Sequence, residues 1–190
     1  MLGSHNSFSY LTPTKWWMKL LTPWVKCQNK TITEQYNMGV RYFDVRIAFN
    51  KNGSVRLVHN WVEYPSPELF EALKTLNNKS GVHLRILLDM RKRPKRAEDI
   101  GNTIKWFYNF IDYVLKNTTV TIDKAIIFWN WKHVIDNGIG VTEYHASVTA
   151  KWYEYIGGLE CWAELHNHDI LFSNSDIVES NEKVLLIDYV

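Results

Sequence analysis

The segment Gly39-Val-Arg-Tyr-Phe-Asp-Val-Arg46 decides the fold. Side chains alternate along it as in a β-strand with two different faces, so that Asp44 and Arg46 share one face. The turn signal at 50–53 leads into a second apolar run, Val55 to His59. The sequence therefore predicts a short hairpin that carries a carboxylate, a guanidinium and an imidazole.

Along the rest of the chain, strand patterns alternate with amphipathic helical patterns. This alternation is typical of an α/β fold with a largely parallel sheet. Strands are predicted over 40–47, 55–59, 82–91, 124–131, 169–173 and 184–190, and helices over 31–39, 66–76 and 98–116. Arg46, His59, Arg91 and Asp188 come at strand C-terminal ends, where a (β/α) barrel carries its active site. Because the strands are few for a regular eight-stranded barrel, we expect a reduced or irregular TIM-type barrel.

Length and composition predict one globular catalytic domain over residues 1–190. The chain has 46% hydrophobic and 22% charged residues and a net charge of +2, which does not indicate nucleic-acid binding. No apolar run reaches the length of a membrane span, and no leader is visible before His5; this leaves the compartment undetermined. Cys27 and Cys161 match no zinc or redox motif and either pair or remain free.

Aromatic residues are abundant, with nine Trp, ten Tyr and eight Phe. The segment 11–24 places Trp16, Trp17 and Trp24 among lysines and between two prolines. We expect a short helix here, begun near Lys15 with Thr14 as its cap. Two interpretations remain open: a helix packed on the core, or an interfacial helix whose tryptophans contact a lipid headgroup region.

The residues with catalytic chemistry form one predicted constellation. Two histidines can serve as base and acid near neutral pH, a carboxylate can fix the tautomer of one ring, and an arginine fits two phosphate oxygens. Together they suffice for cleavage of a phosphodiester by an internal nucleophile. The members of the constellation are His5, Asp44, Arg46, His59, Arg91 and Asp188.

Four motifs, in this order along the chain, resemble those of the X-domain of phosphatidylinositol-specific phospholipase C. They are Gly3-Ser-His-Asn-Ser7, Gly39 to Arg46, Leu57-Val-His59 and Leu185-Leu-Ile-Asp-Tyr189. The resemblance covers the first 90 residues and the final strand, whereas the region from about 116 to 182 matches poorly.

The resemblance implies roles for individual residues. His5 corresponds to the general base that deprotonates the inositol 2-hydroxyl, and Asp188 to the carboxylate that orients it. His59 corresponds to the general acid for the diacylglycerol oxygen, Arg46 to the phosphate-binding arginine, and Asp44 to the acidic residue beside it. The products would be a cyclic inositol phosphate and diacylglycerol.

The resemblance also suggests where substrate and membrane bind. Asn6, Arg91, Trp131 and Tyr144 are the candidates for substrate contacts, with Trp129 and Tyr155 as further aromatic options. Trp16, Trp17 and Trp24 correspond in position to the rim helix through which bacterial members touch membranes, which favours the interfacial interpretation. The expected partners are a phospholipid and a membrane surface, and we expect a monomer.

We expect no metal and no cofactor, because calcium prefers several oxygen ligands and Arg46 and Arg91 put fixed positive charges in this site. One departure concerns Asn6, which stands where bacterial members have an aspartate. If that aspartate supports the acid His59, this chain must use Asp44 instead or work with a weaker acid. The other hypotheses are a different phosphodiester substrate on the same barrel and a catalytically inactive lipid-binding module.

Overall fold

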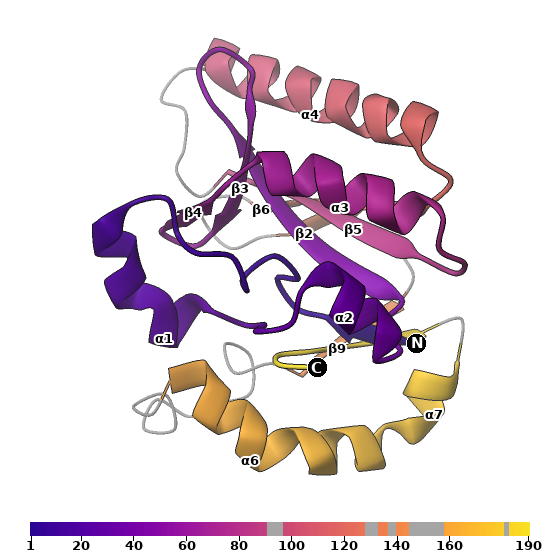
Figure 1. Cartoon of the computed structure of the whole chain (residues 1–190). Coiled ribbons are helices and arrows are strands. Elements are labelled where there is room, and N and C mark those ends of the chain that lie inside the picture. Colours follow the sequence, from indigo (N-terminus) through magenta and orange to yellow (C-terminus); the bar gives the residue numbers. More distant parts are fainter. Residues whose placement is uncertain (91–96, 128–132, 137–139, 145–157, 181–182) are drawn as a thin grey trace.

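A computed structural model of the chain describes residues 1–90, 97–127, 133–136, 140–144, 158–180 and 183–190 (Figure 1). Its centre is one sheet with the strand order β7-β6-β5-β2-β1-β9-β8. The bounds of these strands are β1 Leu2–Ser4, β2 Tyr42–Phe49, β5 His83–Asp89, β6 Thr121–Ile127, β7 His133–Asp136, β8 Gly140–Tyr144 and β9 Lys183–Ile187.

The strands from β6 through β5, β2, β1 and β9 to β8 pair in parallel, and the end strand β7 pairs antiparallel with β6. The hairpin strand β3 (Val55–His59) and the short β4 (Val62–Tyr64) branch off β2 in antiparallel pairing. The predicted parallel α/β sheet and the predicted hairpin are thus confirmed.

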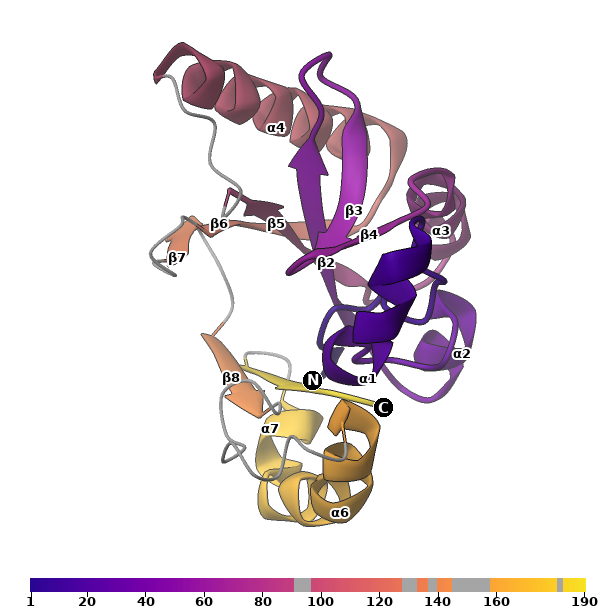
Figure 2. The ribbon, with the colours of Figure 1, turned by 90° about the vertical axis from the view of Figure 1, so that its left-hand side faces the viewer.

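Helices cover the outer face of the curved sheet (Figure 2). Leucine and phenylalanine side chains of α3 and α4 join β2 and β5 residues in the largest core cluster, because both helices have an apolar face at helical spacing. Helix α2 starts with a capping box between Thr31 and Glu34, as its sequence predicts. The helices are α2 (Ile32–Asn37), α3 (Pro67–Asn77), α4 (Ala97–Asn117), α6 (Gly158–Ser173) and α7 (Ser175–Glu179).

The expectation of a barrel is wrong in one respect: the sheet is open, and β7 and β8 form its two ends. A closed barrel of this type has about eight parallel strands, and the parallel strands described here are too few to complete the circle. The predicted strand at 169–173 is also wrong, because these residues form the C-terminal end of α6. Their apolar run is too short for periodicity to separate strand from helix.

The inner face of the sheet differs from the outer face in carrying buried charges. Asp44 on β2 lies beside Arg85 on β5, which lies beside Asp123 on β6, in the register of the parallel ladder. All three side chains are buried. A row of alternating charge therefore crosses the sheet below the strand ends.

Gly3 allows β1 to fit between its neighbours on this inner face. A Cβ atom on Gly3 would lie 2.9 Å from Cγ1 of Val184 and 3.1 Å from Cδ1 of Leu186, both on β9. A larger side chain at position 3 must therefore displace these two side chains or the strand that carries them.

We expect Gly3→Ala to lower the free energy of unfolding by about 1–3 kcal/mol, the usual cost of overpacking. Urea denaturation measures this change. The matched control is Gly101→Ala on α4, where a Cβ meets nothing within 4 Å and alanine should be neutral or stabilising by up to about 1 kcal/mol. Equal stability changes in the two variants would contradict this account of Gly3.

Candidate active site

Three adjacent parallel strands and the hairpin bring the predicted catalytic side chains together. His5 directly follows β1, Asp188 directly follows β9, Asp44 and Arg46 lie on β2, and His59 ends β3. Since β1 lies between β2 and β9, His5 lies between Asp188 on one side and the Asp44–Arg46 pair on the other. All five side chains are buried.

The hydrogen bonds of His5 fix its tautomer. Nδ1 lies 2.6 Å from Oδ1 of Asp188, and Nε2 lies 2.6 Å from a terminal nitrogen of Arg46. A guanidinium can only donate, so Nε2 accepts, and Nδ1 carries the proton that it donates to the carboxylate. His5 is thus a neutral imidazole whose basic lone pair faces Arg46, as a general base requires.

Asp44 holds Arg46 in this position. Its Oδ2 accepts from Nε of Arg46 at 2.9 Å and from the backbone N–H of Asn6 at 3.0 Å, while Oδ1 lies 3.9 Å from Arg85. Burial alone would raise the pKa of Asp44, but the two guanidinium groups, Arg46 before Arg85, and then His5 lower it to about 2. Asp44 is therefore ionised throughout the neutral range.

Asn6 contributes through its backbone. Its φ of 44° lies in the left-handed region, which asparagine tolerates better than most residues. This conformation turns its N–H towards Asp44. The side chain of Asn6 is also buried, and Asn6 directly follows His5 in the chain.

His59 is held by a backbone carbonyl. Its Nδ1 lies 2.8 Å from the carbonyl oxygen of Val25, which requires the proton on Nδ1 and leaves Nε2 for proton transfer. The rings of His59 and His5 are 5.5 Å apart and nearly perpendicular. The carboxylate of Asp44 contacts Arg46, Arg85 and the backbone N–H of Asn6.

Several functional contacts were not identified from the sequence. Arg85 could have been found, because it lies on the same face of its strand as Leu87 and Asp89 and next to Asp44 once the strands are paired. The side-chain amide of Gln28, fully buried, donates to the carbonyls of His5 and Ile187 and so ties β1 to β9. No local pattern marks that contact.

The tryptophan segment adjoins His59. The 3-10 helix η1 (Trp16–Leu21) is followed by the short helix α1 (Thr22–Val25), and the carbonyl of Val25 is the one that binds His59. The expected cap by Thr14 is wrong: η1 begins after Lys15 without a side-chain cap, and the hydroxyl of Thr14 donates to the carbonyl of Glu63. Met18 and Val25 are buried, whereas the exposed fractions of Trp16, Trp17 and Trp24 are 76%, 41% and 47%.

Most of the other residues predicted to contact the substrate lie outside the described part of the chain. Arg91, Trp129, Trp131 and Tyr155 lie outside the described residues. The backbone of Tyr144 ends β8 and pairs with Ile187, immediately before Asp188. Cys27 is a free thiol, buried beside the cluster.

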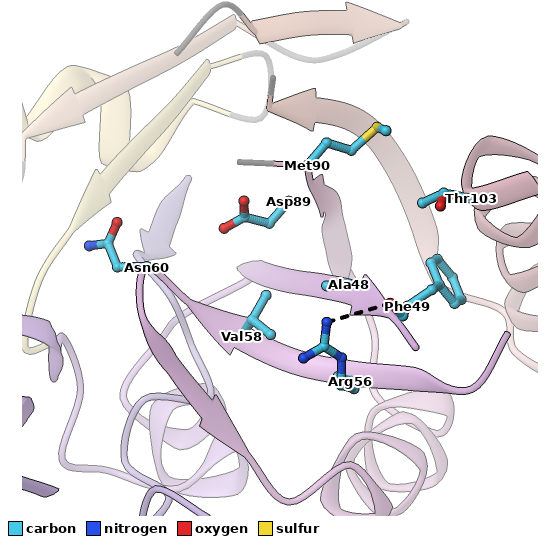
Figure 3. Close-up of a pocket in the computed structure, with 8 residues that line it drawn as sticks. All are labelled: Ala48, Phe49, Arg56, Val58, Asn60, Asp89, Met90 and Thr103. Carbon is cyan, nitrogen blue, oxygen red and sulfur yellow. Dashed lines mark hydrogen bonds between the residues drawn. The ribbon is translucent and has the colours of Figure 1, made fainter. Parts of the chain in front are cut away.

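A pocket of about 50 Å³ lies beside the hairpin of β2 and β3, and none of the five cluster residues lines it (Figure 3). Figure 3 shows Asn60 and Asp89 on two sides of the pocket and the hydrogen bond from Arg56 to the carbonyl of Phe49. Asn60, which lines the pocket, directly follows His59 in the chain. Its lining residues are Ala48, Phe49, Arg56, Val58, Asn60, Asp89, Met90 and Thr103.

Solved structures of bacterial phosphatidylinositol-specific phospholipases C share this arrangement of elements. The enzyme from Listeria monocytogenes aligns with a TM-score of 0.60 at 13% sequence identity, over 100% of this chain and 87% of that chain. This chain has the fold of the phosphatidylinositol-specific phospholipases C. A double mutant of the Staphylococcus aureus enzyme aligns with a TM-score of 0.62 at 17% identity, over 100% of this chain and 84% of that one.

A sequence relative carries a related name. The variant-surface-glycoprotein phospholipase C of Trypanosoma cruzi is 34% identical over 71 residues, which make up 36% of this chain. The aligned part spans 19% of that protein's length, so its activity does not transfer directly. No protein-family profile matches this chain.

The low pKa of Asp44 predicts a pH-dependent stability. The folded-state pKa of about 2 is below the ordinary value of 3.8, so the unfolded chain binds the proton more readily between these values. Stability from this group is therefore fully present above about pH 4 and is lost as the pH falls towards 2, by about 2 kcal/mol.

Urea denaturation between about pH 5 and pH 2 tests this expectation. Wild type should lose about 2 kcal/mol more than Asp44→Asn over this range, although the variant is less stable at every pH because Arg46 and Arg85 lose their partner. Parallel pH profiles for the two proteins would show that Asp44 is not the titrating group.

Proposed function

We propose that this protein cleaves the phosphodiester of phosphatidylinositol-type lipids and releases a cyclic inositol phosphate and diacylglycerol. The observation that carries the proposal is the buried chain Asp188–His5–Arg46–Asp44 with the ring of His59 facing His5. The fold likeness to phosphatidylinositol-specific phospholipases C and the phospholipase C name of the sequence relative support it.

The first proposed step is attack within the substrate. Nε2 of His5 takes the proton of the inositol 2-hydroxyl, and that oxygen attacks phosphorus. Asp188 stabilises the resulting imidazolium through Nδ1, since it is a buried carboxylate at 2.6 Å. Arg46 neutralises the charge on the phosphate oxygens, which is the role that a metal ion plays in other phosphodiester sites.

The second proposed step is release of the lipid. The bond between phosphorus and the glycerol oxygen breaks, and His59 donates a proton from Nε2 to that oxygen. Because the partner of Nδ1 is the neutral carbonyl of Val25, the imidazolium of His59 gains less stabilisation than a carboxylate would give.

A membrane-surface location is part of the proposal. Trp16, Trp17 and Trp24 are exposed, and Trp61, two residues beyond His59, is 66% exposed as well. Indole rings favour the headgroup region of a bilayer. Among the described residues, no helix is long and apolar enough to cross a membrane.

Cleavage of phosphatidylinositol liposomes in the presence of EDTA tests the reaction. We expect wild type to form cyclic inositol phosphate, and His5→Ala and His59→Ala to be slower by about 10²- to 10⁴-fold, the usual worth of a proton-transfer group. Phosphorus NMR identifies the cyclic product.

Loss of wild-type activity with EDTA would refute the metal-free route, and wild-type rates in both variants would refute the assignment of the histidines. Cleavage only of another phosphodiester would favour the alternative substrate, and binding without any cleavage would favour an inactive lipid-binding module.

The double variant Trp16→Ala/Trp17→Ala tests the membrane contact. We expect its affinity for anionic phospholipid vesicles to fall roughly tenfold or more, because two large exposed rings are removed. Its rate on a soluble inositol phosphodiester should change little. The matched control is Phe172→Ala, which removes an 80% exposed ring from α6. Equal losses on vesicles and on soluble substrate would mean that the tryptophans serve the fold instead.

A further inference from the structure

Cys27 is the buried group of the site that the proposed reaction does not use. Its thiol has no exposed surface and forms no disulfide. Sγ lies 4.0 Å from Nδ1 of His59 and 3.6 Å from the carbonyl oxygen of Val25. The backbone of Cys27 is fixed on both sides, since its N–H donates to the hydroxyl of Ser9 and its carbonyl accepts from Tyr189.

His5, Cys27 and His59 together have the ligand types of a transition-metal site. One ligand atom from each lies within 4.8 Å of the others, and all three side chains are buried. Around a tetrahedral zinc ion, nitrogen and sulfur ligands lie roughly 3.3–3.6 Å apart, given bond lengths of about 2.0–2.3 Å. The three side chains would have to close together around an ion to reach these separations.

The carboxylate behind His5 also fits a metal site. Asp188 binds His5 from behind, which is the carboxylate–histidine arrangement that orients histidine ligands in metal sites. The guanidinium of Arg46, 2.6 Å from Nε2 of His5, would move aside for an ion bound at that nitrogen. A thiolate and two imidazoles prefer zinc to calcium or magnesium, which take oxygen ligands.

We propose that His5, Cys27 and His59 form an inhibitory zinc site within the catalytic cluster. Zinc would inhibit the reaction whichever ring nitrogen of His5 and of His59 it binds. On His5, binding at Nε2 occupies the lone pair of the base, and binding at Nδ1 displaces Asp188. On His59, binding at Nε2 removes the proton of the acid, and binding at Nδ1 displaces the carbonyl of Val25. Zinc would thus switch off a reaction that itself uses no metal. The inhibitory effect rests on the proposed function, whereas the binding of metal does not.

Cobalt spectroscopy tests the site without any substrate. Wild type titrated with Co²⁺ should develop the near-ultraviolet charge-transfer band of a thiolate–cobalt bond. The band should be absent in Cys27→Ser, which keeps the size of the side chain and removes the sulfur. It should persist in Cys161→Ser, the matched control for the other cysteine of the chain. Absence of the band in wild type would overturn the proposal even if the variant did not fold.

Inhibition by Zn²⁺ in the liposome assay tests the consequence. The rate of each protein with Zn²⁺ is divided by its own rate without metal. The inhibition constant of Cys27→Ser for Zn²⁺ should then be at least about tenfold higher than that of wild type. The inhibition constant of Cys161→Ser should equal the wild-type value. EDTA should restore the wild-type rate. Equal zinc sensitivity of wild type and Cys27→Ser would mean that zinc acts elsewhere, on the lipid or on the surface, and would overturn the inhibitory site. If no lipid is cleaved but the cobalt band behaves as expected, the proposed function fails and the metal site stands.

Discussion

The hydrogen bond between His5 and Asp188 is the contact on which the rest of the site depends. It joins residues that follow the first and the last strands of the chain, so it can form only when β1 and β9 are paired in register. Gly3 allows that pairing to be close, and Gln28 reinforces it from outside the sheet. The tautomer of His5, and hence its ability to act as a base, is therefore set by tertiary structure rather than by any local motif.

Buried charge dictates the composition of the inner face. A buried carboxylate is tolerated only with a compensating cation or several hydrogen bonds. Asp44 has both, through Arg46, Arg85 and the N–H of Asn6. In the proposed mechanism, the cation that faces the phosphate is Arg46, which Asp44 holds in place. This arrangement is the reason why we propose a mechanism based on arginine and not one based on calcium.

The sequence predicted the features that depend on local periodicity and on the order of motifs. The alternation in β2, the hairpin that ends at His59, the cap of α2 and the helical face of α4 are all local, and all are confirmed. The closure of the sheet was not predictable, since it depends on how many strands pair around the whole circle. The support of His59 was missed for a similar reason: a backbone carbonyl such as that of Val25 carries no signal of residue type. Arg85 was missed because its importance appears only when two strands are set in register.

The position of Arg46 has a consequence for the order of events in the proposed reaction. In the absence of substrate, a terminal nitrogen of Arg46 occupies the lone pair of His5 that must accept the proton. A phosphodiester offers the guanidinium a charged, bidentate partner, which is a stronger one than a neutral imidazole. Substrate binding would draw this end of the side chain towards the phosphate while Nε stays on Asp44. The lone pair of His5 would then become available only when a phosphate is bound, so that one arginine both guards the base and prepares the substrate for attack.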